Sequence, residues 1–151
     1  MAFTHLGHNC HVMNDVTMAN GVGVSGHCTI EDFANIGGMV GIHQFVRVGR
    51  LAMIAGMSGI VKDVPPFCLV EGRGEQTVHD INAIGLRRMG ITQSSRLALH
   101  KAVKLLFKSQ LGLSRAMEIV RREVPSTPEV EELLAFMERV FGGKIGRGDQ
   151  R

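Results

Sequence analysis

Aliphatic residues recur at every sixth position from Leu6 to Ile60. This first ladder misses no position: Leu6, Val12, Met18, Val24, Ile30, Ile36, Ile42, Val48, Ile54 and Ile60. A second ladder of small or β-branched residues follows four positions behind: Cys10, Val16, Val22, Cys28, Ala34, Val40, Val46, Ala52, Ser58 and Val64. A period of six fits neither the spacing of an α-helix nor the alternation of an ordinary strand. A hexapeptide repeat of this kind is typical of a parallel β-helix.

Three hexapeptides would form the three sides of one triangular coil. Residues that are three hexapeptides apart in the sequence would then stack on adjacent coils, roughly 4.8 Å from each other, which is the usual strand spacing. The ladders cover about 6–65, a little over three coils. The general preference of parallel crossovers is right-handed, but the repeat itself does not fix the hand.

Pro65 and Pro66 end the repeat, because proline lacks the N–H group that strand pairing needs. Helices are expected beyond them, over 79–89, 93–108, 114–123 and 127–141. Over 93–108 an apolar stripe at helical spacing carries the prediction: Leu99, Ala102, Val103, Leu106 and Phe107. Ser114 is the expected cap of the third helix, and Thr127-Pro128 opens the fourth. We therefore expect a β-helix over 1–66, an irregular connector over 67–78, a helical domain over 79–143 and a frayed tail over 144–151.

The first coil begins almost at Met1, which leaves an open end with unpaired backbone groups. We expect another chain segment or another subunit to cover this end, or the chain to be a fragment of a longer protein. The N-terminus lacks the pattern of a signal peptide, and no apolar run is long enough to span a membrane. Three cysteines are an odd number and predict no disulfide framework. Cys10 and Cys28 lie one coil apart, but small core residues in reduced form are expected, as in a cytoplasmic protein.

Basic residues concentrate in the middle of the helical region. Residues 87–122 contain nine lysines and arginines and a single acidic residue, Glu118, whereas the flanking segments are slightly acidic. A local excess of this size indicates an acidic partner. A solvated helix face is the alternative interpretation.

Polar residues gather along one edge when the sequence is wound into coils of three hexapeptides each. One corner column contains His8, Gly26, Gln44 and Lys62, and the column beside it contains Asn9, His27, Phe45 and Asp63. His43 directly precedes Gln44. None of these residues is on an inward ladder, so we expect them to face solvent or a neighbouring molecule.

Two chemistries suit such an edge. A neutral imidazole can remove a proton from a hydroxyl group during acyl transfer, while a glycine N–H stabilises the oxyanion. Three histidines can instead bind zinc and leave one position open. The β-helix carbonic anhydrases do so with a pair of histidines less than one hexapeptide apart, whereas His8, His27 and His43 are separated from one another by more than two hexapeptides. His5 and His11 do not supply the pair.

Several segments together resemble a known family: MAFTHLGHNC at 1–10, Gly26-His27, Gly37-Gly38, Ile42-His43-Gln44-Phe45, Asp63-Val64-Pro65-Pro66, Ile81-Asn82 and Gly85-Leu86-Arg87-Arg88. They are similar to segments of the acyl-[acyl-carrier-protein]–UDP-N-acetylglucosamine O-acyltransferases, which perform the first step of lipid A synthesis. The resemblance covers essentially the whole chain, but only about the C-terminal half of the family. It implies a left-handed β-helix, a homotrimer with an active cleft between subunits, and no cofactor, metal, nucleic acid or membrane segment.

The resemblance also assigns roles by position. His8 matches the general base that deprotonates the sugar 3-hydroxyl, and Gly26 matches the oxyanion-binding N–H. The matching sugar-nucleotide contacts are His5, His27, His43, Gln44, Asn82 and Arg88. Gly56 matches a position on the groove for the acyl chain. Acyl carrier protein, which is acidic, would bind the patch of Arg87, Lys101, Lys104 and Lys108.

The chain departs from the family in three respects. Asn9 replaces the carboxylate that often follows the catalytic histidine, and Ile84 replaces an acidic substrate contact. The absent coils carry a further sugar-binding aspartate in the family. A non-catalytic trimeric scaffold and, less favoured, a zinc-dependent protein like the carbonic anhydrases are therefore kept as alternative functions.

Overall fold

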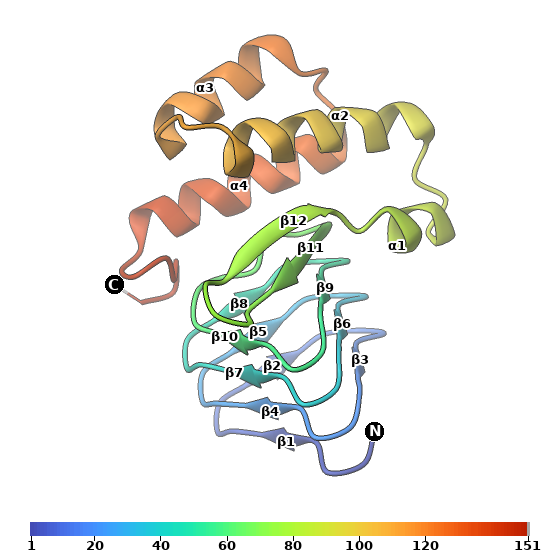
Figure 1. The fold of residues 1–151 in the computed structure, drawn as a ribbon, viewed down its shortest axis with the longest axis vertical. Helices are drawn as coiled ribbons and strands as arrows, with labels where there is room; N and C mark the ends of the chain where they lie inside the picture. The colour runs from blue at the N-terminus through green and yellow to red at the C-terminus, as the bar shows by residue number, and fades with distance from the viewer. Residues whose placement is uncertain (151) are drawn as a thin grey trace.

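A computed structural model describes residues 1–150 of the chain as a β-helix covered at one end by helices (Figure 1). Each side of the β-helix is a two-residue strand, and the strands repeat at every sixth position. They are β1 His5–Leu6, β2 His11–Val12, β3 Thr17–Met18, β4 Gly23–Val24, β5 Thr29–Ile30, β6 Asn35–Ile36, β7 Gly41–Ile42, β8 Arg47–Val48, β9 Met53–Ile54 and β10 Gly59–Ile60.

The strands form three parallel sheets, one for each face of the prism: β1-β4-β7-β10, β2-β5-β8 and β3-β6-β9. Leu6 pairs with Val24, Val24 with Ile42, and Ile42 with Ile60. Every step is one coil of three hexapeptides, as in the other two sheets. The predicted coil and its register are therefore confirmed.

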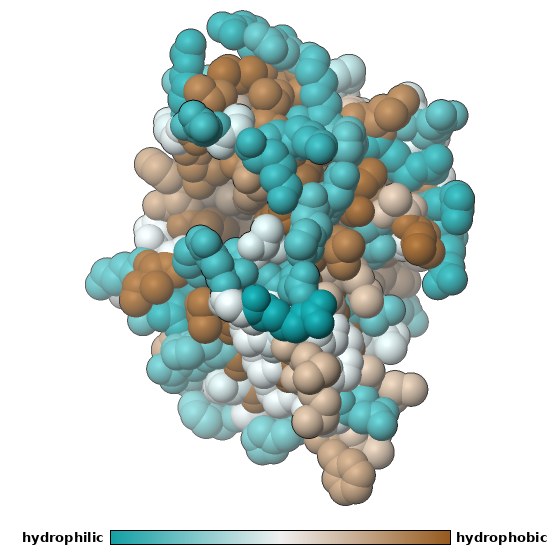
Figure 2. All heavy atoms as spheres, viewed as in Figure 1, coloured by the Kyte–Doolittle hydropathy of each residue, from teal (hydrophilic) through white to brown (hydrophobic). Residues whose placement is uncertain are grey.

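Both ladders point into the prism and are buried from Val22 onward. The first coil is covered on one side only, so Leu6 is 47% exposed and Val12 is 39% exposed. In Figure 2, white to tan residues run down the lower coils on the side shown. The predicted open end is thus present in this structure.

The corners of the prism depend on a backbone conformation that the repeat did not predict. One residue in each hexapeptide has a positive φ, and nine of these residues between Phe3 and Met57 are not glycine, with φ between 54° and 65°. This left-handed region is uncommon for residues that carry a Cβ atom. The tight turn between two short strands imposes it at every corner.

The expected irregular connector is instead a β-hairpin. Strand β11, Cys68–Glu71, pairs in parallel with β9, and β12, Thr77–Ile81, pairs antiparallel with β11. The irregular connector and the helical start at residue 79 were therefore wrong. Once past the two prolines, the chain returns to the free edge of β9 and satisfies its backbone groups there.

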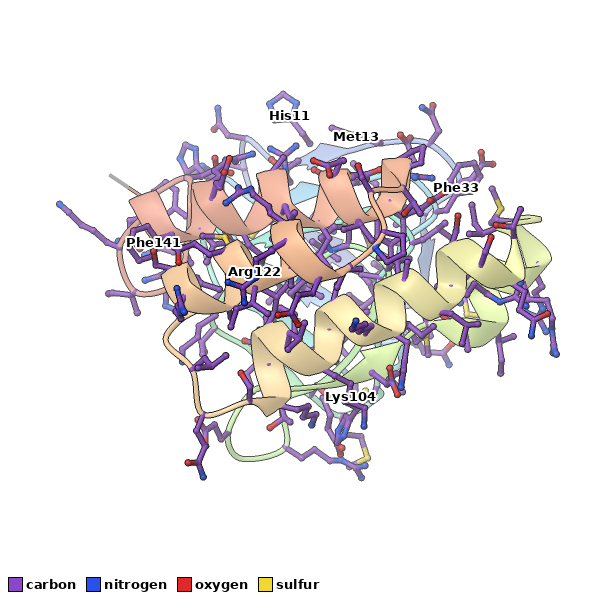
Figure 3. The ribbon with its side chains drawn as sticks, turned by 90° about the horizontal axis from the view of Figure 1, so that it is seen from above. His11, Met13, Phe33, Lys104, Arg122 and Phe141 are labelled. Carbon is purple, nitrogen blue, oxygen red and sulfur yellow. The ribbon has the colours of Figure 1, made fainter. Side chains whose placement is uncertain are left out.

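Helices form in each of the four segments where they are expected, although the first begins at Ala83. They are α1 Ala83–Arg88, α2 Gln93–Val103, a π-helical turn η1 Lys104–Lys108, α3 Leu113–Glu123 and α4 Pro128–Gly142. Thr127 caps α4 as expected, accepting a hydrogen bond from the N–H of Val130. The cap of α3 is Gly112 rather than Ser114, so that expectation was wrong. Seen from above, α2, α3 and α4 lie side by side over the end of the β-helix (Figure 3).

The end of the described chain is ordered against the β-helix rather than frayed. The N–H of Asp63 donates to the carbonyl of Gly146, and the N–H of Gly148 donates to the Asp63 carboxylate. The expectation of a frayed tail was therefore wrong for residues 144–150, while Arg151 lies outside the described residues. The division into domains stays a prediction. No helix in the described part of the chain is long and apolar enough to cross a membrane.

Candidate active-site edge

A groove of about 610 Å³ lies on the face formed by β1, β4, β7 and β10. Three stacked glycines, Gly23, Gly41 and Gly59, line this face, and the first two have open space where a Cβ atom would be. His5, His8 and His43 also line the groove. The absence of side chains along the glycine column leaves room for a ligand beside the imidazoles.

His8 has one ring nitrogen free to act as a base. Its Nδ1 lies 3.1 Å from the side-chain oxygen of Asn9, and an amide oxygen can only accept a hydrogen bond. Nδ1 therefore carries the proton, which leaves a lone pair on Nε2. The ring lies directly over Gly26, where a Cβ atom would be 2.8 Å from the His8 Nε2 atom. Only glycine fits beneath the imidazole without displacing it.

Gly26 also offers a free donor beside that nitrogen. Its N–H makes no hydrogen bond to another group within residues 1–150. His27 follows it and meets the His8 ring edge-on, with ring centroids 4.9 Å apart. His27 also stacks on Phe45, with ring centroids 5.0 Å apart. The neighbours His27 and Phe45 of the second predicted column are thus in contact, and His8 of the first column packs against them.

His43 is held by a residue that the sequence did not indicate. The guanidinium of Arg147 lies with Nη1 2.5 Å from the His43 Nδ1 atom and 3.0 Å from the carbonyl oxygen of Gln44. Arg147 is only 5% exposed. An arginine in a glycine-rich tail has no periodic relation to the hexapeptides, so no pattern in the sequence could have placed it here.

Asp63 anchors the tail beside this edge. Its carboxylate accepts hydrogen bonds from the N–H groups of Arg47 and Gly148, at 2.9 and 2.7 Å. Burial raises the pKa of Asp63 above its usual value, and the two backbone donors oppose this shift only in part.

The remaining predicted site residues lie at other corners of the prism. Asn82 accepts a hydrogen bond from the N–H of Gly85 and donates to the carbonyl of Leu51, at the corner that follows β8. Gly56 is exposed at the corner between β9 and β10. Arg88 is exposed in the last turn of α1. One chain therefore brings His5, His8, Gly26 and His43 to one groove, but it does not bring Asn82, Arg88 or Gly56 to the same corner.

Ion pairs neutralise part of the basic region over 87–122. Arg115, Arg121 and Arg122 form ion pairs with glutamates. Arg87, Lys101, Lys104 and Lys108 are exposed, and among the described residues none of these four forms an ion pair. Lys101 donates to the carbonyl of Glu123. The helices that cover one end of the β-helix are called the helical cap below. Figure 3 shows Lys104 and Arg122 on different helices of it.

The donor geometry does not support the zinc alternative. Within residues 1–150, no three side chains of His, Cys, Asp or Glu are grouped so that they could hold a metal ion.

Fold and groove together define a hexapeptide-repeat β-helix protein with a histidine-lined edge and a helical cap. A family model described as UDP N-acetylglucosamine O-acyltransferase, domain 2, matches residues 63–147, more than half of the chain. The chain belongs to this family.

Relatives and solved structures agree with the family model. The acyl-[acyl-carrier-protein]–UDP-N-acetylglucosamine O-acyltransferase of Anaeromyxobacter sp. (strain K) is 42% identical over 138 residues, which are 91% of this chain and 53% of that protein. The Synechocystis enzyme of the same name is 42% identical over 92% of this chain and 50% of its own length. The chain therefore spans about half the length of these curated relatives.

Two solved structures show the same arrangement. The LpxA structure from Bacteroides fragilis, described as a UDP-N-acetylglucosamine acyltransferase, has a TM-score of 0.86 at 35% identity and covers 89% of this chain and 52% of that one. The Arabidopsis UDP-N-acetylglucosamine acyltransferase has a TM-score of 0.84 at 29% identity over 98% of this chain and 53% of that one.

Proposed function

We propose that this chain contributes the general base and the oxyanion donor of a cytoplasmic acyltransferase that uses acyl carrier protein and UDP-N-acetylglucosamine. The observation that carries the proposal is the free Nε2 of His8 directly over Gly26. A base and an N–H donor at one point are what acyl transfer to a hydroxyl group requires. The family relationship supplies the substrates, since the related enzymes are named for them.

The reaction can be written around these two residues. The 3-hydroxyl oxygen of the sugar attacks the carbonyl carbon of the 3-hydroxyacyl thioester, while its proton passes to the Nε2 atom of His8. The N–H of Gly26 donates a hydrogen bond to the resulting oxyanion. When the tetrahedral intermediate collapses, the C–S bond breaks and the imidazolium of His8 returns the proton to the leaving thiolate.

Asn9 shapes the base differently from a carboxylate. Its amide oxygen holds the His8 Nδ1–H at 3.1 Å and so fixes the tautomer and the ring orientation. An amide carries no negative charge, so it stabilises the imidazolium less than an aspartate would. Asn9 would therefore orient the imidazole of His8 correctly but would stabilise its protonated form less than a carboxylate would.

A homotrimer would complete the site. His8, Asn82 and Gly56 lie at three different corners of the same prism, and of the three only His8 lines the groove. A cleft between neighbouring subunits would bring the corner of one chain beside that of the next. In this arrangement Gly56 would border the acyl chain, and Asn82 and Arg88 would approach the nucleotide. The exposed Arg87, Lys101, Lys104 and Lys108 would attract the acidic carrier protein.

The test is transfer of a 3-hydroxyacyl group from carrier protein to UDP-N-acetylglucosamine by the wild-type chain and by His8→Ala. General acid–base catalysis contributes a factor of about 10² to 10⁴, so we expect a loss of that size. His11→Ala is the matched control, because His11 is exposed, lies on the β2 face and points away from the body of the molecule (Figure 3). Wild-type turnover by His8→Ala would exclude His8 as the base.

Ligand binding separates the enzyme from the scaffold alternative. An acyltransferase edge must bind the sugar nucleotide, whereas a scaffold need not. Calorimetry that detects no binding of UDP-N-acetylglucosamine by wild type at millimolar concentration would favour the non-catalytic scaffold.

A further inference from the structure

Arg147 contacts His43 from a buried position in the tail. Its Nη1 atom lies 2.5 Å from Nδ1 of His43 and 3.0 Å from the carbonyl oxygen of Gln44. Within residues 1–150 the guanidinium forms no ion pair with a carboxylate. Its polar contacts are thus directed to the active-site edge, although the residue is 104 positions away from His43 in the sequence.

The contact fixes where the His43 proton resides. A guanidinium is always protonated and can only donate hydrogen bonds. Nδ1 of His43 must therefore accept, which leaves its proton on Nε2. The Nδ1 atom also lies 3.2 Å from the carbonyl oxygen of Gln44. Because both of these atoms accept from Arg147, we interpret that distance as a separation between two acceptors rather than a hydrogen bond.

The tail holds Arg147 on both sides. Gly146 accepts from the N–H of Asp63 at 2.9 Å, and Gly148 donates to the Asp63 carboxylate at 2.7 Å. The residue between them has little freedom to move away from His43. Gly146 has a φ of +67°, which favours glycine at the turn that brings the tail back.

We infer that Arg147 is a positioning residue that makes His43 a hydrogen-bond donor to the sugar nucleotide. The inference rests on the proposed function and deepens it. His43 lines the groove, so its Nε2–H can donate to a carbonyl or phosphate oxygen of the ligand. The two histidines then have opposite tautomers. His8 presents a lone pair on Nε2 because Asn9 accepts from its Nδ1, whereas His43 presents a proton on Nε2 because Arg147 donates to its Nδ1.

Opposite tautomers would prevent the two imidazoles of this groove from exchanging roles. A base must have a free lone pair, and a donor to a phosphate or carbonyl oxygen must have a proton. Without Arg147, the carbonyl of Gln44 at 3.2 Å would favour a proton on Nδ1 of His43. Nε2 would then lose its proton and repel the same ligand oxygen.

Nitrogen NMR of the full chain, without any ligand, tests the tautomer directly. In wild type at alkaline pH, His43 should show an unprotonated Nδ1 and a protonated Nε2, and His8 the reverse. In Arg147→Met, the His43 signals should exchange positions while those of His8 stay unchanged. Lys144→Ala is the matched control, since Lys144 is exposed on the same tail segment, and it should leave both rings as in wild type. A wild-type His43 with a protonated Nδ1, or an unchanged His43 in Arg147→Met, would overturn the inference.

Two further measurements guard against unfolding and against a merely structural role. Arg147→Lys keeps a charged donor, so it should retain the wild-type tautomer at least in part even if Arg147→Met unfolds the tail. In binding assays, Arg147→Met should weaken affinity for UDP-N-acetylglucosamine by about tenfold, as expected when one hydrogen bond to a charged group is lost. In a His43→Ala background the same change should have no further effect. An equal loss in both backgrounds would show that Arg147 does not act through His43.

The inference about the His43 tautomer and the proposed function are tested by different measurements. If wild type does not bind the sugar nucleotide, the proposed function is wrong, but the NMR result still decides how Arg147 sets the His43 ring.

Discussion

The β-helix and the helical cap differ in how their sequences determine contacts. In the β-helix the neighbour of almost every residue lies one coil away along the sequence, as the pairings of Leu6 with Val24 and of Ile42 with Ile60 show. In the cap, contacts join positions with no common interval, such as Lys101 with Glu123 and Arg121 with Glu138, which are 22 and 17 residues apart. A period therefore predicts which residues form a site only where the fold itself is periodic.

The largest expected effect separates the first coil from the coils above it. Leu6 and Ile42 occupy equivalent positions on the same sheet, but Leu6 is 47% exposed and Ile42 is 2% exposed. Ile42→Ala should destabilise the fold by about 2–5 kcal/mol, because it removes buried methyl groups and leaves a cavity. Leu6→Ala should cost less than about 1 kcal/mol in this chain. Urea unfolding of both variants checks the pair.

Equal losses for the two variants would break the comparison. They would mean that Leu6 is as well packed as Ile42 in solution, for example because another copy of the chain covers the first coil. Repeating the unfolding at several protein concentrations would detect such association, since the stability of an oligomer depends on concentration.

The sequence predicted the β-helix almost completely because burial and register follow from one interval. The column that contains His27 and Phe45 was predicted from positions alone, and these two rings are in contact; His8, predicted for the adjacent column, meets His27 edge-on. The positive φ angles at the corners were not predicted, because residues such as Phe33 and Leu51 do not favour that conformation. There the closure of the coil overrides local preference.

The cap was predicted only in its helices. Apolar spacing predicted α2 because it buries one face, which includes Leu99, and the start signal Thr127-Pro128 predicted α4. The β11–β12 hairpin was missed because its pairing partner is the edge of β9, which no local pattern reveals. The place of Arg147 beside His43 was missed for the same reason, since it depends on the tail returning to Asp63.

Asn82 joins the two regions, and its substitution should have the next largest effect. Its side-chain oxygen caps α1 through the N–H of Gly85, and its amide donates to the carbonyl of Leu51 in the β-helix at 2.9 Å. Asn82→Ala should lower stability by about 1–3 kcal/mol through the lost cap and the unpaired carbonyl. Asn82→Asp keeps the cap acceptor but loses the donor, so it should fall in between. Thermal unfolding measures all three proteins.

Asn82 is also a predicted nucleotide contact, and the same variants separate the two roles. If Asn82→Ala were as stable as wild type yet bound UDP-N-acetylglucosamine more weakly, the side chain would act on the ligand rather than as a joint between the regions.

The ion pair between Arg50 and Glu132 should give a smaller but measurable coupling between the regions. Arg50 donates through Nε and Nη2 to the carboxylate at 2.9–3.2 Å, and its guanidinium lies 4.9 Å from the ring centre of Phe67. A double-mutant cycle with Arg50→Ala and Glu132→Ala should give a coupling of about 1 kcal/mol, since the pair is bidentate but partly exposed. The control pair Arg115–Glu118, about 60% exposed on α3, should give about 0.3 kcal/mol. Similar coupling energies in both pairs would mean that the Arg50–Glu132 ion pair stabilises the protein no more than an exposed ion pair on one helix does.

The smallest effects should appear as opposite pH dependences of two carboxylates. Burial raises the pKa of Asp63, whereas hydrogen bonds from Arg73 and His79 lower the pKa of Glu71 on β11. A raised folded-state pKa means that the folded state binds the proton more tightly, so the contribution of Asp63 to stability increases as pH falls through that pKa. The contribution of Glu71 is present above its unfolded pKa of about 4.3 and is lost as pH falls through its lowered folded-state value.

On acidification, the stability of wild type relative to Asp63→Asn should therefore rise, while its advantage over Glu71→Gln should shrink. Urea midpoints measured between about pH 7 and pH 3 decide the signs. Two differences that change in the same direction would contradict the contrast between a buried carboxylate in the β-helix and a partly exposed, ion-paired carboxylate on the hairpin.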